Sequence, residues 1–113
     1  MKALFYFLLI AGINLNAYCL FNKTNQNLLF MVEFYPKASE SIFVFKKTVK
    51  PNEVSCCKTG DSCNPLIQKN QQLSFYAFKN EKAVEGCDIF GLNDSNVTLN
   101  SFLVFDNCEW SVD

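Results

Sequence analysis

The chain of 113 residues contains no histidine and no arginine, so its ten basic residues are all lysines. Without histidine, the serine and cysteine triads and the histidine-dependent ribonucleases lack their general base. Without arginine or a run of lysines, the chain lacks the basic footprint with which proteins contact phosphate backbones. These absences predict a protein that binds no nucleic acid and uses none of these catalytic mechanisms.

Metal and cofactor motifs are absent as well. The spacing from Cys57 to Cys63 is wider than that of a zinc knuckle, and no histidine could complete such a site. One loop has side-chain oxygens that could bind calcium, but their spacing is not that of an EF-hand. Asparagine and aspartate are common in turns, and this explains their presence in the loop better. We therefore expect no metal and no cofactor. The residues of that loop are Asp88, Asn93, Asp94 and Asn96.

Only one long apolar run is present, and it lies at the N-terminus. Met1 and Lys2 precede the apolar residues 3–13, and Ala17 supplies a small residue soon afterwards. The run is shorter than the about 20 residues of a transmembrane helix and has the layout of a secretory signal peptide. We predict a signal peptide over residues 1–17, a secreted single domain over residues 18–113, and no stable membrane anchor.

Cysteine is abundant for so small a domain. A domain of about 100 residues buries little more than about 60% of its unfolded surface, so covalent bridges contribute much to its stability. An even number of cysteines in a secreted chain predicts disulfides, here three. The cysteines are Cys19, Cys56, Cys57, Cys63, Cys87 and Cys108.

Three of these cysteines lie in the segment 54–64, and we expect their disulfides to hold the fold together. Adjacent Cys56 and Cys57 could form a vicinal disulfide, but strand alternation favours different partners for them. Six cysteines allow 15 connectivities, and the sequence leaves the choice open. One reasonable arrangement pairs Cys57 with Cys63, Cys56 with Cys87, and Cys19 with Cys108.

The remaining sequence is typical of β-structure. No segment shows a period of 3.6 residues, and turn signals recur every 8 to 12 residues or so. This pattern predicts an all-β fold, a small antiparallel β-sandwich of about seven short strands stapled by disulfides. The predicted strands are 18–22, 28–35, 41–49, 73–79, 84–92, 97–99 and 102–110.

Three triplets match the acceptor pattern for N-linked glycans, and they begin at Asn22, Asn93 and Asn96. In a secreted chain we expect a glycan on Asn22 and on at least one of the other two. Asn93 and Asn96 lie so close together that two glycans would crowd each other. The alternative is chance, because an asparagine-rich chain produces such triplets freely.

Carboxylates and aromatic rings are the remaining candidates for chemistry. Paired aspartates could form a glycosidase site, but a substrate cleft is hard to build in about 96 residues, so we expect no enzyme. Ten phenylalanines in residues 18–113, with Trp110 and the tyrosines, either fill a phenylalanine-rich core or form an exposed patch. The core is the simpler interpretation. The aspartates considered were Asp61, Asp88, Asp94 and Asp106.

The order of short motifs resembles that of small secreted cysteine-rich proteins from early-diverging fungi, including root-symbiotic ones. The matching segments are Cys19-Leu20-Phe21-Asn22-Lys23-Thr24, Pro51-Asn52-Glu53, Cys56-Cys57, Cys63-Asn64, Cys87 and Cys108. Asn52 stands where that pattern usually has glycine. The resemblance implies a compact β-sandwich, loosely similar to thaumatin-like domains, and secretion.

These features favour a secreted, non-catalytic interaction protein, effector-like or binding to extracellular matrix. Its partner would be an extracellular protein or carbohydrate ligand. Two alternatives are a membrane-active or antimicrobial β-sandwich toxin, which the mildly acidic composition disfavours, and a small carboxylate-dependent hydrolase.

Overall fold

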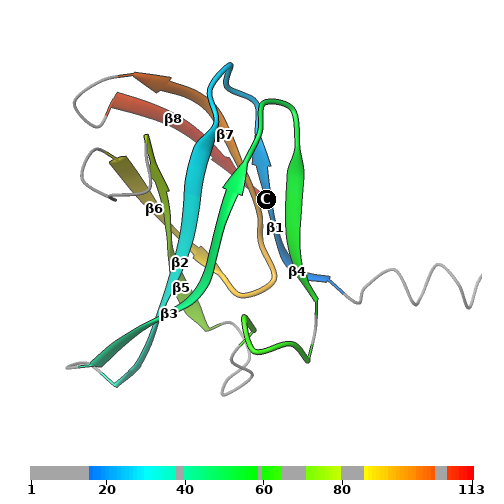
Figure 1. Cartoon of the computed structure of the whole chain (residues 1–113). Coiled ribbons are helices and arrows are strands. Elements are labelled where there is room, and N and C mark those ends of the chain that lie inside the picture. Colours follow the sequence, from blue (N-terminus) through cyan, green and yellow to red (C-terminus); the bar gives the residue numbers. More distant parts are fainter. Residues whose placement is uncertain (1–15, 38–39, 59, 65–70, 80–85, 104–106) are drawn as a thin grey trace, which may run out of the picture.

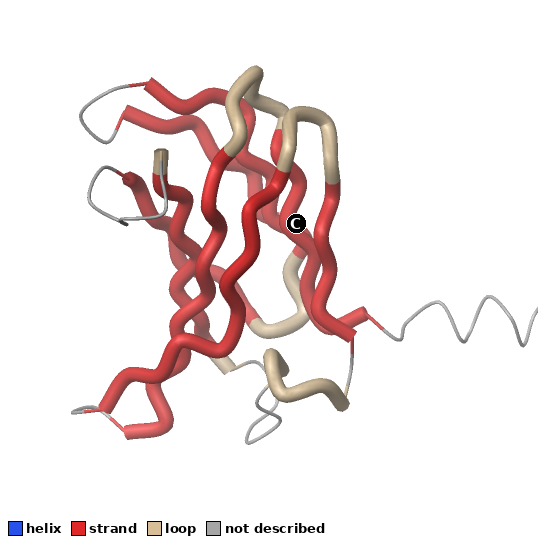
Figure 2. Tube along the Cα trace, viewed as in Figure 1, coloured by secondary structure: helices blue, strands red, loops and turns tan. Residues whose placement is uncertain are grey.

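The structure is a computed structural model that describes residues 16–37, 40–58, 60–64, 71–79, 86–103 and 107–113. These residues form eight β-strands and no helix (Figures 1 and 2). The strands are β1 (Asn16–Asn22), β2 (Leu28–Lys37), β3 (Glu40–Val49), β4 (Val54–Lys58), β5 (Gln72–Phe78), β6 (Gly86–Leu92), β7 (Asn96–Leu103) and β8 (Asn107–Val112).

Two four-stranded sheets pack face to face (Figure 1). Sheet A has the strand order β4-β1-β7-β8, and sheet B has the order β3-β2-β5-β6. All described pairings are antiparallel except that of β1 with β7, which is parallel. The predicted disulfide-stapled all-β sandwich is thus confirmed, with eight strands and one parallel pair.

Alternating side chains of both sheets form the core. In β2 the even-numbered apolar residues from Leu28 to Phe34 point inward, as the pattern predicts. Tyr18 of sheet A lies among them, with its ring edge-on to Phe45 at 6.0 Å and to Phe75 at 5.5 Å between ring centroids. Other buried members include Leu20, Leu73, Ala77, Val97, Leu99 and Phe102.

A β-bulge changes the predicted alternation of β3. Val32 pairs with Phe45, whereas the next residue, Glu33, pairs with Phe43, so Val44 has no partner of its own. Phe45 therefore points into the core and Phe43 points away from it. Strict alternation over the predicted strand 41–49 implies that these two phenylalanines share one face. That implication is wrong, because the bulge inserts an extra residue between them.

The far ends of β2 and β3 extend beyond the other strands (lower left in Figure 1). Pairing of β2 with β5 ends at Phe34 and Leu73. Pro36, which we expected to end the strand, therefore lies within β2, where no β5 residue requires its missing N–H.

The predicted last strand, 102–110, was also wrong. Phe102 pairs with Cys108 and Leu103 pairs with Asn107, so the chain reverses within that segment and forms the hairpin of β7 and β8. The sequence pattern does not reveal this reversal, because apolar and polar residues alternate with the same period in both strands of a hairpin. The structure also adds β4, which was absent from the predicted set.

The disulfides are Cys19–Cys56, Cys57–Cys63 and Cys87–Cys108. The prediction that Cys56 and Cys57 bond to different partners is confirmed, and so is the Cys57–Cys63 pair. The pairings of Cys56 with Cys87 and of Cys19 with Cys108 were wrong. Antiparallel β1 and β4 place Cys19 directly opposite Cys56, which leaves Cys87 and Cys108 to join β6 to β8.

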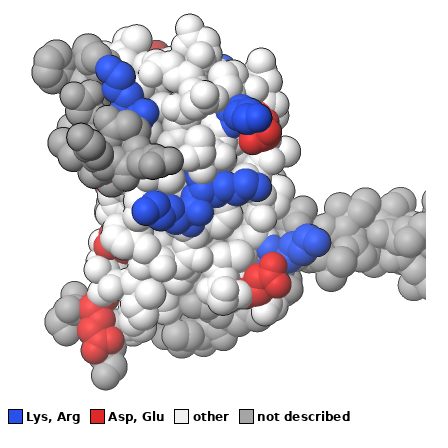
Figure 3. All heavy atoms as spheres, in the orientation of Figure 1, with Lys and Arg blue, Asp and Glu red and all other residues white. Residues whose placement is uncertain are grey.

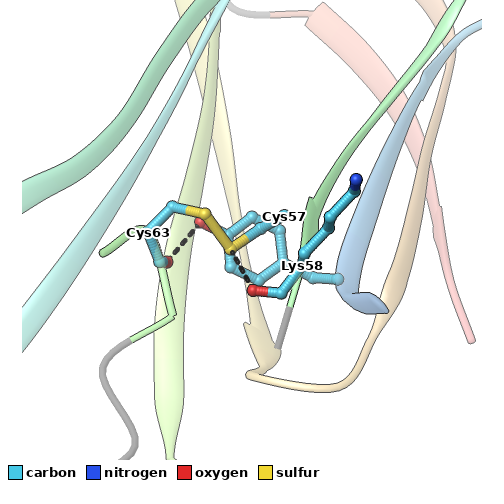
Figure 4. The surroundings of a disulfide bond; sticks show 4 residues. Cys57, Lys58 and Cys63 are labelled. Atoms are coloured by element: carbon cyan, nitrogen blue, oxygen red, sulfur yellow. Dashed lines mark hydrogen bonds between the residues drawn. A yellow bond between two sulfur atoms is a disulfide. The ribbon is translucent and has the colours of Figure 1, made fainter. Parts of the chain in front are cut away.

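The Cys57–Cys63 bridge closes a short loop (Figure 4), and Cys63 packs against the core. Gly60 has a φ of 93°, a left-handed conformation that glycine adopts without strain. The buried Tyr18 hydroxyl donates a hydrogen bond to the Cys63 carbonyl at 2.7 Å, and burial raises the pKa of Tyr18. The loop is thus fixed both covalently and by the core.

Gly86 and Gly91 lie in β6, which pairs with β5 without a register shift. Both glycines permit close approach of aromatic rings. A Cβ on Gly86 would lie 2.3 Å from a Phe78 ring carbon, and one on Gly91 would lie 2.9 Å from a Phe75 ring carbon.

The predicted signal peptide falls mostly on residues 1–15, outside the described residues. Asn16 and Ala17 already belong to β1, with Asn16 opposite Lys58, so cleavage after Ala17 would shorten that strand by two residues. Within the described ranges, no helix has the length and hydrophobicity needed to cross a membrane.

Candidate functional site

The outer face of sheet B is rich in aromatic side chains. Register places Tyr35, Phe43, Tyr76, Phe78 and Phe90 on this face, away from the core. Phe90 is 60% exposed, Phe43 50% and Tyr35 41%. We call these five residues the aromatic face. Part of the phenylalanine content therefore forms an exposed patch, although the core was the simpler interpretation.

A carboxylate lies at the centre of the aromatic face. Glu33 of β2 is only 7% exposed, and its Oε1 accepts hydrogen bonds from the Tyr35 hydroxyl at 2.5 Å and the Tyr76 hydroxyl at 2.6 Å. A buried carboxylate without such donors would be costly. The two hydroxyls satisfy it, and in return it fixes the orientation of both tyrosine rings.

The ionisation of this cluster follows from these contacts. Burial by itself raises the pKa of Glu33, but hydrogen bonds from Tyr35, Tyr76 and Ser41 outweigh burial, and the pKa lies below its usual value. The pKa of Tyr76 is raised by burial and by its bond to Glu33. At neutral pH Glu33 is therefore a carboxylate, and the Tyr76 phenol bonded to it is neutral.

The rings of the face are held in a fixed arrangement. Tyr76 and Phe78 stack nearly parallel, 6° between planes and 5.8 Å between centroids, and Phe43 lies 5.9 Å from Tyr76. Phe78 extends over Gly86 of the neighbouring strand. Hydrogen bonding of Tyr76 and the absence of a Cβ at Gly86 thus set the positions of the stacked pair.

A surface pocket of about 370 Å³ adjoins this pair, where β5 and β6 of sheet B approach β8 of sheet A. Its aromatic lining comes from Tyr76, Phe78 and Trp110, and its carboxylate comes from Asp88. Gly86 and the Cys87–Cys108 bridge complete the described lining. Three of the seven described lining residues are aromatic, and the volume lies in the range of small-ligand sites.

Charges are sparse on the face of the molecule shown in Figure 3. Lysines form a short row across its middle, and carboxylates lie nearer its margins. No extended field of one sign is visible there, which agrees with the small net charge of −1 for the whole chain.

The sequon at Asn22 has a structural role. Asn22 has no exposed surface, and its Nδ2 donates hydrogen bonds to the carbonyls of Gln26 and Val49, each at 2.8 Å. Its Oδ1 accepts from the backbone and the hydroxyl of Thr24. A glycan would replace one of the two Nδ2 hydrogens and needs an exposed side chain. In this structure Asn22 therefore lacks the exposed amide that a glycan needs, and its glycosylation stays untested.

The turn at Asn52 docks on the same residue. The backbone N–H of Asn52 donates to the Asn22 carbonyl at 2.6 Å, and that of Asn22 donates to the Glu53 carbonyl at 3.0 Å. Asn52 has a φ of 64°, where glycine is favoured and asparagine is the best-tolerated alternative. Asn52 can therefore adopt the conformation for which the motif pattern described above usually has glycine.

The other two sequons differ in accessibility. Asn93 is buried in the turn between β6 and β7, and the Ser95 hydroxyl accepts a hydrogen bond from the Leu92 N–H at 3.0 Å. Asn96 is exposed and shares the outer face of sheet A with Cys19. Asn96 is therefore the accessible acceptor among the three, and its use stays a prediction.

The aspartates proposed for a hydrolase are dispersed. Asp61 lies in the Cys57–Cys63 loop, Asp88 on β6 and Asp94 in a turn, all exposed, while Asp106 is outside the described residues. The described part of the chain contains no group of three or more acidic or cysteine side chains that could hold a metal ion.

Glu33 and its tyrosines were absent from the sequence-based candidates. The available signal was a glutamate in an otherwise apolar strand, with a tyrosine two residues later on the same face. The partner Tyr76 lies 43 residues away and reaches Glu33 only through pairing of β2 with β5.

Comparison of the chain with models of protein families, with curated proteins and with solved structures gives no match in any of the three.

Proposed function

We propose that the protein is a secreted, non-catalytic binding domain whose ligand contacts the aromatic face of sheet B. The ligand would be an extracellular protein or a carbohydrate. The observation that carries this proposal is the set of exposed aromatic side chains around the satisfied carboxylate of Glu33.

The two outer faces of the sandwich differ in a way that supports the proposal. On sheet A the outward positions include the Cys19–Cys56 bridge and Asn96, and the large apolar residues Val54 and Leu103 lie at its ends. On sheet B the exposed ring of Phe43 packs against Tyr76, and the half-buried rings of Tyr76 and Phe78 stack on each other. Exposed apolar groups that are contiguous mark interaction surfaces, whereas single ones need no explanation.

Preorganisation also supports a binding role. Aromatic side chains contribute large contact area at small entropic cost, and tyrosine, phenylalanine and tryptophan are enriched at binding interfaces. Because Glu33 fixes the rings of Tyr35 and Tyr76 before any ligand arrives, little further ordering is required on binding.

Secretion is part of the proposal. Three disulfides in a small domain are the state expected in an oxidising compartment. The N-terminal apolar run and the resemblance to small secreted proteins of early-diverging fungi point the same way. N-terminal sequencing of protein recovered from culture medium should begin within a few residues of Tyr18, whereas a full-length N-terminus in the cytosol would contradict secretion.

The binding face is tested with charged substitutions. The variant Phe43→Asp/Phe90→Asp places two carboxylates on the aromatic face, and Val54→Asp/Leu103→Asp places two at comparably exposed positions of sheet A, 52% and 56% exposed. Retention of each secreted protein on extracellular-matrix and cell-wall fractions is measured, after circular dichroism has confirmed the fold.

We expect the sheet B variant to lose retention by more than tenfold and the sheet A variant to behave like the wild type. Equal retention of the sheet B variant would overturn the assignment of the face. Loss in both variants would show that added negative charge, rather than this face, determines retention, and would also overturn it.

A further inference from the structure

The pocket beside the Cys87–Cys108 bridge combines rigid aromatic rings with a hydrogen-bonding group. Tyr76 and Phe78 supply the parallel pair on one side, and Trp110 of the other sheet supplies a third ring. The bridge itself ties β6 to β8 and so fixes the relative positions of the two sheets at this point. Because the walls are fixed before binding, a small ligand would lose little affinity to reorganisation.

Each ring of the pair is locked by a separate contact. The Tyr76 hydroxyl is bonded to Glu33, and Phe78 lies across Gly86, where any side chain would collide with it. Trp110 packs against the core residue Phe30, with 6.5 Å between ring centroids. The faces of such rings carry partial negative charge and attract the C–H groups of a flat ligand.

The carboxylate of Asp88 is the charged acceptor of the described lining and suits a hydroxyl or amide donor. Asp88 lies opposite Tyr76 across the β5–β6 pair, exposed at the pocket. No lysine is among the described lining residues, so the described lining offers no cation for a carboxylated or sulfated ligand. Charge complementarity therefore favours a ligand that donates hydrogen bonds and carries no negative charge.

A second observation concerns Trp110. Its indole Nε1 is buried and has no hydrogen-bond acceptor in the described structure. Buried tryptophan N–H groups usually find a partner, and an unmade bond costs free energy. Trp110 lines the pocket, so a ligand hydroxyl oxygen would satisfy this N–H only if the indole turned it towards the pocket.

A ligand that meets these requirements has a flat apolar face, a rim of hydroxyl groups and no acidic group. This is the chemistry of a pyranose ring. On the basis of the proposed function, we propose that the extracellular ligand is a neutral saccharide and that one of its sugar rings occupies this pocket, stacked on Phe78 or Tyr76 and hydrogen-bonded to Asp88.

The test uses calorimetric titration of the mature secreted protein with chitotetraose, cellotetraose and laminaritetraose. Oligogalacturonate serves as an acidic probe and choline as a cationic one. The variants are Phe78→Ala and Asp88→Ala, with Leu103→Ala as a matched exposed apolar control on sheet A. Thermal melts show which variants are folded, and the exposed Asp88 variant keeps the test valid if Phe78→Ala unfolds.

We expect saturable binding of at least one neutral oligosaccharide. Phe78→Ala should weaken it by at least roughly tenfold, or about 1.4 kcal/mol, Asp88→Ala should weaken it severalfold, and Leu103→Ala should leave it unchanged. Binding should be insensitive to salt, because no charge pair forms.

Three results would overturn the inference: binding of oligogalacturonate or choline only, binding of a neutral saccharide that neither pocket variant weakens, or no binding of any saccharide. In the last case, selective loss of retention in Phe43→Asp/Phe90→Asp would leave the binding face in place and remove only the saccharide. The failure of the two proposals is thus distinguishable.

Discussion

At the scale of single residues, two side chains have roles that their types alone do not reveal. Asn22 belongs to a sequon, yet its amide uses both Nδ2 hydrogens to hold the carbonyls of Gln26 and Val49. It joins the end of β1 to the loop after it and to the end of β3. Removing it would leave several buried backbone groups unpaired, at about 1 to 3 kcal/mol each.

The first prediction concerns glycan occupancy. Protein secreted by a eukaryotic host should carry its N-glycan at Asn96 and none at Asn22, because only the former side chain is exposed. Enzymatic deglycosylation followed by peptide mass mapping identifies the modified asparagine. The variant Thr98→Ala, which removes the Asn96 sequon alone, should abolish the mass shift, and deamidated Asn22 in the treated wild type would contradict the assignment.

Glu33 is the second such residue. Its pKa is lower in the folded protein than the ordinary value of 4.5, because the tyrosine and serine hydroxyls favour the charged form more than burial opposes it. A depressed carboxylate pKa contributes stability that is complete above the unfolded value and is lost as pH falls through the folded one.

The second prediction follows from the lowered pKa of Glu33. The free energy of unfolding should fall as the pH drops below about 4.5, and Glu33→Gln should show a shallower fall because a glutamine does not titrate. Urea denaturation at several pH values between 3 and 7 measures both slopes. The exposed Glu109→Gln is the control and should retain the wild-type slope, and an identical slope in both variants would rule out the role of Glu33.

At the scale of strands, the disulfides connect elements over different lengths of chain. Cys19–Cys56 joins β1 to its neighbour β4 across 37 residues, Cys87–Cys108 joins the two sheets across 21, and Cys57–Cys63 closes 6. A bridge restricts the unfolded chain more when it closes a longer loop. The local Cys57–Cys63 bridge should therefore contribute least.

The third prediction ranks the bridges. If a bridge stabilises by restricting the unfolded chain, removing Cys19–Cys56, which spans 37 residues, lowers the free energy of unfolding by about 3.8 kcal/mol. Removing Cys87–Cys108, which spans 21, lowers it by about 3.3 kcal/mol, and removing Cys57–Cys63, which spans 6, by about 2.2 kcal/mol. Thermal melts of the three double alanine variants should rank in that order, with about 4 to 8 °C lost per kcal/mol. A largest loss for Cys57→Ala/Cys63→Ala would show that the contact of Tyr18 with the loop outweighs chain entropy.

At the scale of the whole molecule, the two outer faces of the sandwich differ, and the proposed binding surface lies on only one of them. Sheet A carries Asn96 and the Cys19–Cys56 bridge on its outer surface, and sheet B carries the aromatic face. A glycan at Asn96 would leave the aromatic face free. Because a domain of this size buries only part of its surface, the disulfides stabilise the fold while sheet B keeps exposed rings.

The fold class and the face of the strand on which a residue lies followed from the sequence pattern. Alternation of period two showed which residues of β2 and β5 share a face, and adjacency of Cys56 and Cys57 showed that they bond apart. Both properties depend only on residues that are neighbours along the chain, because backbone geometry makes successive side chains of a strand point to opposite faces.

Tertiary structure alone decided which face is the core and which residues meet. Both faces of β5 are rich in apolar residues, so the pattern could not tell Phe75, in the core, from Phe78, on the surface. The pairing of Cys19 with Cys56 and the contact of Glu33 with Tyr76 depend on which strands become neighbours. That choice is a free-energy balance over the whole chain, because each of these contacts forms only when two strands distant in sequence have paired.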